Sequence, residues 1–317
     1  MDKAIEDFDH TWLRLELRHL AALSAVVRLG SFRAAAASLG YSQSAVSVQI
    51  RALEEIVGAS VLQRSPGAGA ASPTPAGRAL LAAAPALIAA MRDAQRGMAA
   101  AMQSRPVLRV GIFPTAAVAL LPGVLQRLDP EIEVVLHEQP DPEDLERALQ
   151  LGRLDVSFLS SESAGDDLAQ AALLDDPYVV LVPRDGAFSK TRRFSVERLR
   201  DLPVIAYRSL PDAVDPLLLL PPEFRPRRIA TRTDDDRTVH ALVAAGLGVA
   251  LLPALSIDAH DPRVRAVALR PALPPRRIVL AWRAAANRPP AVQAFIDAAQ
   301  ASARAATRSS PGTRAAS

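Results

Sequence analysis

The chain has 317 residues, of which 50% are hydrophobic and 22% are charged, a composition typical of a globular protein with two or three domains. It has no cysteine, which excludes disulfide scaffolds, cysteine-ligated zinc and thiol nucleophiles. Aromatic residues make up 4%, which argues against base stacking on single-stranded nucleic acid, and the net charge is only +3.

The N-terminal residues 1–11 are acidic and have no apolar segment, so we expect a disordered tail and no signal peptide. No run of eighteen apolar residues follows, so we expect no membrane span and a cytoplasmic location. Between Trp12 and Arg78 there are seven arginines and three glutamates. This basic segment is consistent with contacts to phosphates but does not establish them.

Two short helices separated by a tight turn are predicted after a first helix that ends near Gly30. Gly40 would end one of them in the left-handed conformation, and the Ser42 hydroxyl would cap the other. The capped helix is expected to bury four apolar residues: Val46, Ile50, Leu53 and Val57. Its outward residues are Gln43, Ser44, Ser47, Val48 and Arg51. Such a face suits a reader of the DNA major groove, and a plain helix corner with a solvated face fits the spacing equally well.

A strand-like stretch at 60–64 and a loop at 65–73 follow, which is the order of a winged helix-turn-helix over residues 12–74. Thr74 and Pro75 then form a strong helix start, and a linker helix is predicted over 75–104. Its apolar residues recur at steps of four and three: Leu80, Ala84, Leu87, Met91, Ala94, Met98 and Ala101. This stripe predicts pairing with a second copy, with packing on the same chain as the alternative. Pro85 is expected to bend the helix.

From residue 105 to 300, strands alternate with helices, which predicts a two-lobed α/β domain with a parallel sheet. The first lobe is expected to contain strands at 107–112, 132–136 and 154–159, with helices at 113–128 and 144–151. A strand at 178–183 would leave that sheet, and a second lobe would hold helices near 196–201, 213–220 and 236–245 and strands at 204–207, 228–232 and 248–253. Strands at 264–269 and 277–282 would return to the first lobe. A closing helix is predicted over 290–303, and the chain end, counted as residues 301–317 in the domain division, is expected to be a disordered tail.

Several short motifs of this chain occur in the order and near the spacing found in one family. They include Gly30-Ser31-Phe32, Ser42-Gln43-Ser44-Ala45-Val46-Ser47, Gln49-Ile50-Arg51-Ala52-Leu53-Glu54, Thr74-Pro75-Ala76-Gly77 and, more loosely, Gly152-Arg153-Leu154-Asp155 and the segment 242–253. On these residues the chain resembles the LysR-type transcriptional regulators. The resemblance implies dimers or tetramers that place one helix in each major groove of an imperfect palindrome of double-stranded DNA, and a sensor domain similar to periplasmic solute-binding proteins.

The resemblance also implies which residues contact DNA. The base-reading positions fall on Gln43, Ser44, Ser47 and Val48, and the full expected set is Arg33, Ser42, Gln43, Ser44, Ser47, Val48, Gln49, Arg51 and Arg64. Three features depart from the family. Val48 stands where arginine or another polar residue is usual, Ala34 stands where arginine is frequent, and the wing loop after Arg64 is long and contains no basic residue.

The family binds its effectors in the cleft between the lobes, and the matching positions here are Thr115, Ala116, Ser160, Ser161, Tyr207, Ser209 and Thr233. Thr115 is predicted at a helix N-terminus, which would favour an anionic group such as a carboxylate. For each hydroxyl taken alone, capping or turn formation is the competing interpretation. No cofactor is expected.

Two other classes of protein compete with a regulator. An enzyme is conceivable because the α/β half alone could hold an active site and Asp234, Asp235 and Asp236 could bind a metal, although helix capping explains that triplet better. The five histidines show no ligand spacing, and no phosphate-binding loop or nucleophile elbow stands out. A solute-binding protein conflicts with the missing signal peptide and the N-terminal helices. We therefore expect a homo-oligomeric regulator rather than an enzyme, controlled by a small molecule bound between its lobes.

Overall fold

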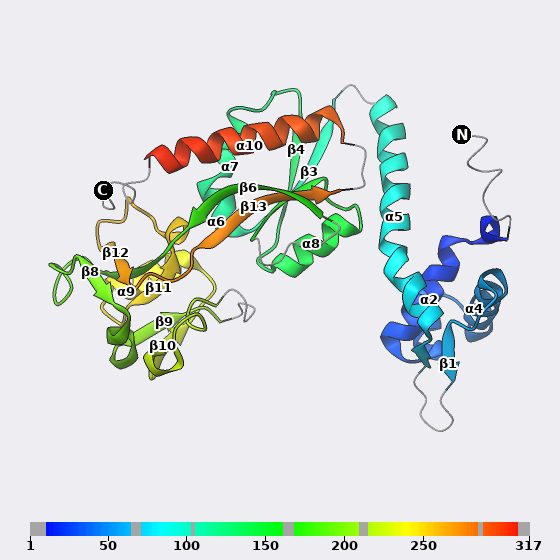
Figure 1. Cartoon of the computed structure of the whole chain (residues 1–317), viewed down its shortest axis with the longest axis horizontal. Coiled ribbons are helices and arrows are strands. Elements are labelled where there is room, and N and C mark those ends of the chain that lie inside the picture. The colour runs from blue at the N-terminus through cyan, green and yellow to red at the C-terminus, as the bar shows by residue number, and fades with distance from the viewer. Residues whose placement is uncertain are drawn as a thin grey trace. The chain divides into compact units, whose positions relative to one another are not determined.

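The computed structural model describes residues 11–64, 71–102, 105–160, 168–208, 215–284 and 288–309 (Figure 1). Contacts along the chain divide it into two compact units, residues 1–96 and residues 97–317, and each has its own hydrophobic core. We call them the head unit and the sensor unit. No helix within the described ranges is both long enough and apolar enough to span a bilayer.

The head unit is mostly helical. It contains η1 (Trp12–Arg14), α2 (Leu17–Leu29), α3 (Phe32–Leu39), α4 (Gln43–Val57), β1 (Leu62–Arg64), β2 (Ala71–Pro73) and most of α5 (Pro75–Met102). The three helices α2, α3 and α4 pack around buried residues that include Leu23, Val46 and Leu53. One detail differs from the expected core: Ile56 is buried, whereas Val57 is only half-buried against this core.

The expected helix ends in the head unit are confirmed. Gly40 and Gly58 have φ angles of 71° and 70° at the ends of α3 and α4, and Gly30 ends α2 in the same left-handed conformation. The Ser42 hydroxyl accepts a hydrogen bond from the Ala45 N–H at 3.2 Å, as an N-cap should. Thr74 caps α5 in the same way through the Gly77 N–H at 3.0 Å.

The wing is an antiparallel hairpin in which β1 pairs with β2, with Leu62 opposite Pro73. The sequence predicted a loop up to Pro73, so the strand at Ala71–Pro73 corrects that expectation, while the wing tip at 65–70 lies outside the described residues. Helix α5 runs through Pro85. Its stripe divides in two: Leu80 and Ala84 are buried in the head unit's own core, whereas Leu87, Met91 and Met98 are 42%, 49% and 70% exposed.

The sensor unit has two lobes. The first lobe is built on a five-stranded sheet in the order β4-β3-β5-β13-β6. Its elements are β3 (Val107–Ile112), α6 (Pro114–Ala119), α7 (Leu121–Leu125), β4 (Glu133–Glu138), α8 (Pro142–Gln150), β5 (Val156–Ser160), β6 (Leu168–Asp176), β13 (Arg276–Arg283) and α10 (Pro290–Ser309). Helices α6, α7 and α10 cover one face through a core that includes Phe158 and Phe295, and α8 packs against the other through Leu145 and Leu149.

The second lobe combines a four-stranded sheet, ordered β11-β7-β12-β8, with a parallel pair β9-β10. Its elements are β7 (Tyr178–Pro183), β8 (Arg193–Ser195), η3 (Val196–Asp201), β9 (Pro203–Ala206), η5 (Pro222–Phe224), β10 (Arg228–Arg232), α9 (Asp236–Ala244), β11 (Ala250–Pro253), η6 (Ala254–Ser256) and β12 (Val264–Arg270). The chain crosses between the lobes from β6 to β7 and again from β12 to β13.

Four sequence-based expectations for the sensor unit are wrong. The first sheet is mixed, because β13 runs antiparallel to both β5 and β6, and the strand β6 was not predicted at all. Strand β12 belongs to the second sheet, where Val264 pairs with Pro183 of β7. The expected helix near 213–220 forms turns over its described part, 215–220. Residues 304–309, which follow the predicted helix and were expected in the tail, continue α10, and residues 310–317 lie outside the described ranges.

Candidate nucleic-acid interface and ligand pocket

Helix α4 presents one face to the core of the head unit and the other to solvent. Gln43, Ser44 and Arg51 are exposed, Val48 is 64% exposed, and Ser47 is half-buried beside them. None of these side chains makes an ion pair with another described residue. This outer face of α4 is therefore a row of short, uncharged side chains followed by one arginine, and its groups remain available to a partner.

Of the expected DNA contacts, Ser42 has a role within the head unit and Gln49 is only partly accessible. Ser42 caps α4, and its hydroxyl also lies 2.9 Å from that of Ser44. Gln49 is half-buried, and its Oε1 is shielded from solvent without a hydrogen-bond donor among the described residues. Arg33 is exposed near the start of α3, and Ala34 beside it is exposed too. Arg64 ends strand β1, and its side chain lies outside the described atoms.

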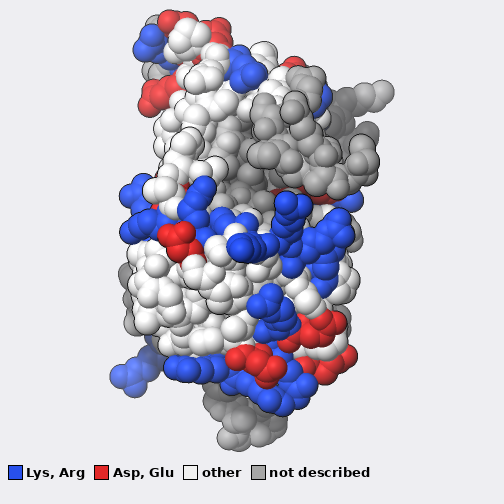
Figure 2. Space-filling view, turned by 90° about the vertical axis from the view of Figure 1, so that its left-hand side faces the viewer, with Lys and Arg blue, Asp and Glu red and all other residues white. Residues whose placement is uncertain are grey.

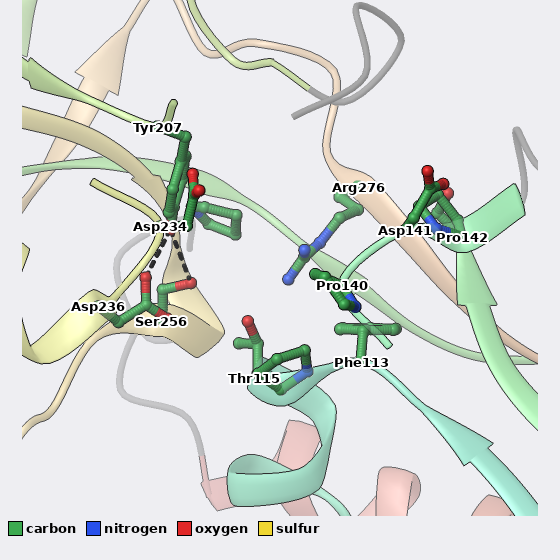
Figure 3. A pocket seen from close by; sticks show the side chains of 13 residues that line it. Phe113, Thr115, Pro140, Asp141, Pro142, Tyr207, Asp234, Asp236, Ser256 and Arg276 are labelled. Atoms are coloured by element: carbon green, nitrogen blue, oxygen red, sulfur yellow. Dashed lines mark hydrogen bonds between the residues drawn. The ribbon is translucent and has the colours of Figure 1, made fainter. Parts of the chain in front are cut away.

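A pocket of about 190 Å³ lies between the two lobes of the sensor unit (Figure 3). It sits at the strand ends: residues after β3 and β4 and at the end of β5 line it from the first lobe, and residues after β9, β10 and β11 line it from the second. Such an edge is where ligands bind in open α/β sheets. The lining consists of Phe113, Pro114, Thr115, Pro140, Asp141, Pro142, Ser160, Tyr207, Asp234, Asp236, Pro253, Ser256 and Arg276.

Arg276 enters this pocket from the start of β13. Its Nη2 donates to Asp176 Oδ2 at 2.7 Å, and the Asp176 side chain is completely buried. Burial raises the pKa of Asp176, while Arg276 and backbone N–H groups such as that of Leu255 oppose the rise. The guanidinium also lies 5.1 Å from the centre of the Phe113 ring, a cation–π distance. These contacts hold the head of Arg276 at the cavity.

Asp236 enters the pocket from the second lobe, at the start of α9. The Tyr207 hydroxyl donates to its Oδ1 at 2.7 Å and lies 3.4 Å from the Ser256 hydroxyl (Figure 3). Ser256 also hydrogen bonds to the Asp236 carboxylate. Burial raises the pKa of Asp236, and the two hydroxyl donors oppose that rise. Burial and the neighbouring carboxylate both raise the pKa of Tyr207, so its hydroxyl remains a donor at neutral pH.

The other two carboxylates of the lining are already engaged. Asp234 accepts the Arg208 N–H at 2.8 Å and forms an ion pair with the same residue's guanidinium at 3.1 Å. Asp141 caps α8 by accepting the Glu143 N–H at 2.9 Å. Figure 2 shows many basic side chains, nearly all of them arginine, on the outer surface of the second lobe. Arg276 is the one cation among the described residues that line the pocket.

Three of the expected effector contacts line the pocket: Thr115, Ser160 and Tyr207. Ala116 lies instead in the hydrophobic core beneath it, and Thr233 accepts the Asp235 N–H at 3.3 Å in the turn before α9. Ser161 and Ser209 lie outside the described residues. Sequence reasoning missed Phe113, Asp236, Ser256 and Arg276. Of these only Asp236 had a signal, the aspartate triplet, in which Asp235 is indeed the helix cap, accepting the Thr238 N–H at 2.7 Å. No group of three potential metal-binding side chains occurs among the residues described.

Comparison with known proteins agrees with this architecture. The model of the family "Bacterial regulatory helix-turn-helix protein, lysR family" matches residues 17–78, and that of "LysR substrate binding domain" matches residues 101–304. The chain belongs to the LysR family of transcriptional regulators. Its helix-turn-helix head and two-lobed sensor domain are those of this family, and the resemblance seen in the sequence motifs is confirmed.

LysR-family relatives cover most of the chain. A "Probable hydrogen peroxide-inducible genes activator" of Streptomyces viridosporus is 32% identical over 282 residues, covering 86% of this chain and 89% of the relative. The "Probable HTH-type transcriptional regulator LrrA" of Synechococcus elongatus is 30% identical and covers 89% and 96%. Among solved structures, a full-length OxyR cysteine variant from Pseudomonas aeruginosa aligns with a TM-score of 0.59 at 25% identity, covering 90% of this chain and 95% of that one.

Proposed function

We propose that this LysR-family regulator is a cytoplasmic homo-oligomer that reads double-stranded DNA with α4 and binds a small-molecule effector in the pocket between its lobes. The observation that carries the DNA-reading role is the outer face of α4. A major groove admits one helix, and short side chains there allow the helix backbone to approach the base edges closely. Gln43 can pair with adenine, Ser44 and Ser47 can bond to either kind of base, and Val48 can contact a thymine methyl group.

Two exposed arginines of the helix-turn-helix support contacts with DNA phosphates. Arg51 lies one turn beyond Ser47 on the exposed side of α4, and Arg33 lies near the start of α3. Neither forms an ion pair with a described residue. We assign them to the DNA backbone, because arginine with free donors binds phosphate in two-pronged fashion.

The exposed half of the α5 stripe supports pairing of two copies. Leu87, Met91 and Met98 continue the spacing of Leu80 and Ala84 along the same helix but have no core of their own unit to enter. A second α5 packed against this stripe would remove these apolar side chains from water. Two copies related by a two-fold axis would present two α4 helices, which matches a palindromic site with half-sites about one helical turn apart.

The pocket supports an effector that is bound reversibly. The relative from Streptomyces viridosporus is named for hydrogen peroxide, but this chain has no cysteine and cannot form a disulfide or oxidise a thiol. A ligand that contacts both lobes would change their relative arrangement only if it binds the two arrangements with different affinity. We propose that this difference alters how the paired heads engage their DNA.

The decisive experiment is a gel shift with the DNA upstream of the chain's own gene, against random DNA of the same length, at about 0.15 M salt. We expect specific retention by the wild type. Gln43→Ala and Ser47→Ala should each weaken it by about 1–3 kcal/mol, the range for one base contact. Ser24→Ala is the matched control, because Ser24 is an exposed serine of α2 that does not belong to the expected DNA-contact set. Equal retention of random DNA, or Ser47→Ala behaving like Ser24→Ala, would contradict the proposal.

The oligomer and the effector need separate measurements. Met91→Glu should lower the molecular mass in solution by light scattering, whereas Val118→Glu, at an apolar position 80% exposed on α6, should not. Adding a pool of metabolites should change the length of the nuclease footprint on the upstream fragment or the bend of the bound DNA. If no pool changes either quantity, the proposed coupling between pocket and heads is wrong.

A further inference from the structure

Arg276 offers the pocket a donor that the protein does not use. Its Nη2 is bound to Asp176, but its Nη1 makes no hydrogen bond with any residue that the structure describes. In Figure 3 the guanidinium points into the middle of the cavity, on the side where the Thr115 hydroxyl also points inward. One N–H donor of a guanidinium and one hydroxyl together form a receptor for a carboxylate.

Asp236 offers the opposite charge from the other lobe. Both of its side-chain partners, Tyr207 and Ser256, are neutral hydroxyls, and no cation of the described chain lies within ion-pair distance of it. It is nevertheless close enough to Arg276 for the positive charge of that residue to stabilise its ionised form. A half-buried carboxylate whose hydrogen-bond donors are neutral hydroxyls retains acceptor capacity for a positively charged group.

The remaining walls limit the size and the nature of the ligand body. The volume of about 190 Å³ lies below the range of about 300–1,000 Å³ typical of drug-sized ligands. The walls between the two charged groups are largely apolar and consist of Phe113, Pro114, Pro140, Pro142 and Pro253. A compact molecule with a short hydrocarbon part and polar ends fits such a space.

We infer that the effector is a small amino-carboxylate, which places its carboxylate against Arg276 and Thr115 and its ammonium group against Asp236. The inference rests on the proposed function, because it names the ligand class of the same pocket. A purely anionic ligand would lie close to the half-buried carboxylate of Asp236, and a purely cationic ligand would lie close to the guanidinium of Arg276, so each would be near one like charge. A ligand with both charges can place each of them beside a group of opposite charge.

This ligand class also explains why the two receptors belong to different lobes. Arg276 and Thr115 are held by the first lobe, and Asp236, Tyr207 and Ser256 by the second. A bound amino-carboxylate therefore links the lobes through two charge-assisted contacts. Each half of the molecule alone, the carboxylate or the amine, can engage only one lobe.

The test compares four probes of equal carbon number by isothermal titration calorimetry on the full-length protein: butyrate, n-butylamine, 2-aminobutyrate and 4-aminobutyrate. At least one amino acid should bind wild type about tenfold or more tightly than both butyrate and butylamine, as expected for one additional hydrogen bond to a charged group. The two amino acids differ in the separation of their charges, so their ranking reports the distance between the receptors. Butyrate or butylamine binding as tightly as the better amino acid would overturn the inference, as would failure of all four to bind.

Asp236→Asn isolates the contact with the ammonium group. It removes the negative charge while keeping an oxygen that accepts from Tyr207, so the fold is preserved. The better amino acid should then bind no more tightly than butyrate does. Asp201→Asn is the control, because it removes the charge of an exposed aspartate of the second lobe that does not line the pocket, and it should preserve the preference for the amino acid over butyrate. An unchanged amino-acid affinity in Asp236→Asn would overturn the inference.

Arg276→Lys isolates the contact with the carboxylate. The lysine keeps a positive charge beside Asp176 but lacks Nη1, so the preference of the pocket should shift toward butylamine by about tenfold.

These results are distinguishable from failure of the proposed function. Tight binding of butyrate would refute the amino-carboxylate and leave a regulator with an anionic effector. Loss of specific DNA retention would refute the regulator whatever the pocket binds.

Discussion

The outer face of α4 and the pocket of the sensor unit are built in opposite ways. The face of α4 lies within nine consecutive residues, 43–51, is exposed, and contains one charged side chain without an ion pair. The pocket gathers residues from Phe113 to Arg276 in sequence, and its two central charges are largely withdrawn from water. In the head unit, the residues proposed to bind DNA are therefore different from those that stabilise the fold. In the sensor unit, the charged residues of the pocket serve both binding and stability. Substitutions on α4 should change binding alone, whereas substitutions at the pocket charges should change binding and folding together.

The largest effect is expected from Arg276→Met. It leaves the buried carboxylate of Asp176 without its cation, which typically costs about 3–5 kcal/mol of unfolding free energy. The matched substitution in the head unit is Arg51→Met, which should change that free energy by less than about 0.5 kcal/mol and weaken DNA binding.

The two stability effects are measured by urea unfolding in two backgrounds. For Arg51→Met, a Trp282→Phe background leaves Trp12 as the reporter for the head unit, and for Arg276→Met the background is Trp12→Phe. Trp282 of β13 is then the reporter for the sensor unit, since the chain has two tryptophans. Adding Asp176→Asn to Arg276→Met should recover part of the loss, because the uncompensated charge is gone. A loss below about 1 kcal/mol in Arg276→Met would show that the ion pair contributes little, and the contrast between the two sites would fail.

The same contrast explains what could be predicted from the sequence. The outer face of α4 follows from local rules: Gly40 and Ser42 define where the helix begins, and the spacing of Val46, Ile50 and Leu53 defines which side is buried. These rules act over a few residues, so they can be applied to a sequence alone. Whether the face contacts bases, and which ones, is not a local property, so those roles remain proposals.

The pocket could be predicted only in part, because it depends on strand order. Thr115, Ser160 and Tyr207 follow or end predicted strands, and all three line the cavity. Arg276 stands 100 residues from its partner Asp176, on a strand whose antiparallel place beside the unpredicted β6 brings the two together. Periodicity identifies a strand but not its neighbours. For the same reason β12 was placed in the wrong sheet, although its range was predicted well.

A second test asks whether the stability of the head unit lies in its packing rather than on its reading face. A Cβ added at Gly77 would overlap the backbone carbonyl oxygen of Val61, where α5 meets the wing. Gly77→Ala should therefore destabilise the head unit by about 1–3 kcal/mol, the usual cost of overpacking. Gly97 lies on the same helix with no atom within 4 Å of such a Cβ, and Gly97→Ala should stabilise by about 0.5–1 kcal/mol. Thermal unfolding of both variants decides the point. Equal melting temperatures would contradict it.

Ser42 combines a stabilising role with a proposed DNA-binding role, since it caps α4 and also belongs to the expected DNA-contact set. Ser42→Ala should cost about 1 kcal/mol of stability through the lost cap. Ser42→Asp keeps a capping oxygen and adds a negative charge, so it should retain stability but weaken DNA binding by repelling phosphates. Unfolding curves and gel shifts on the same samples separate the effects. If Ser42→Asp binds DNA as well as wild type, this end of α4 does not face the DNA backbone.

The smallest effect on stability is expected from Val48→Arg. This substitution also tests most directly whether the outer face of α4 contributes nothing to the packing of the head unit. Val48 is 64% exposed and belongs to no part of the head unit's core, so the substitution should leave the unfolding free energy within about 0.5 kcal/mol of wild type. If α4 lies in a major groove, the new guanidinium can reach a phosphate or a guanine. A phosphate contact would steepen the dependence of log K on log salt concentration by about 0.9 per head, whereas a guanine contact would change the preferred sequence instead. Binding isotherms at several salt concentrations, on the upstream fragment and on random DNA, distinguish these outcomes. An unchanged slope together with an unchanged preference would place Val48 away from the DNA and contradict the reading orientation of α4.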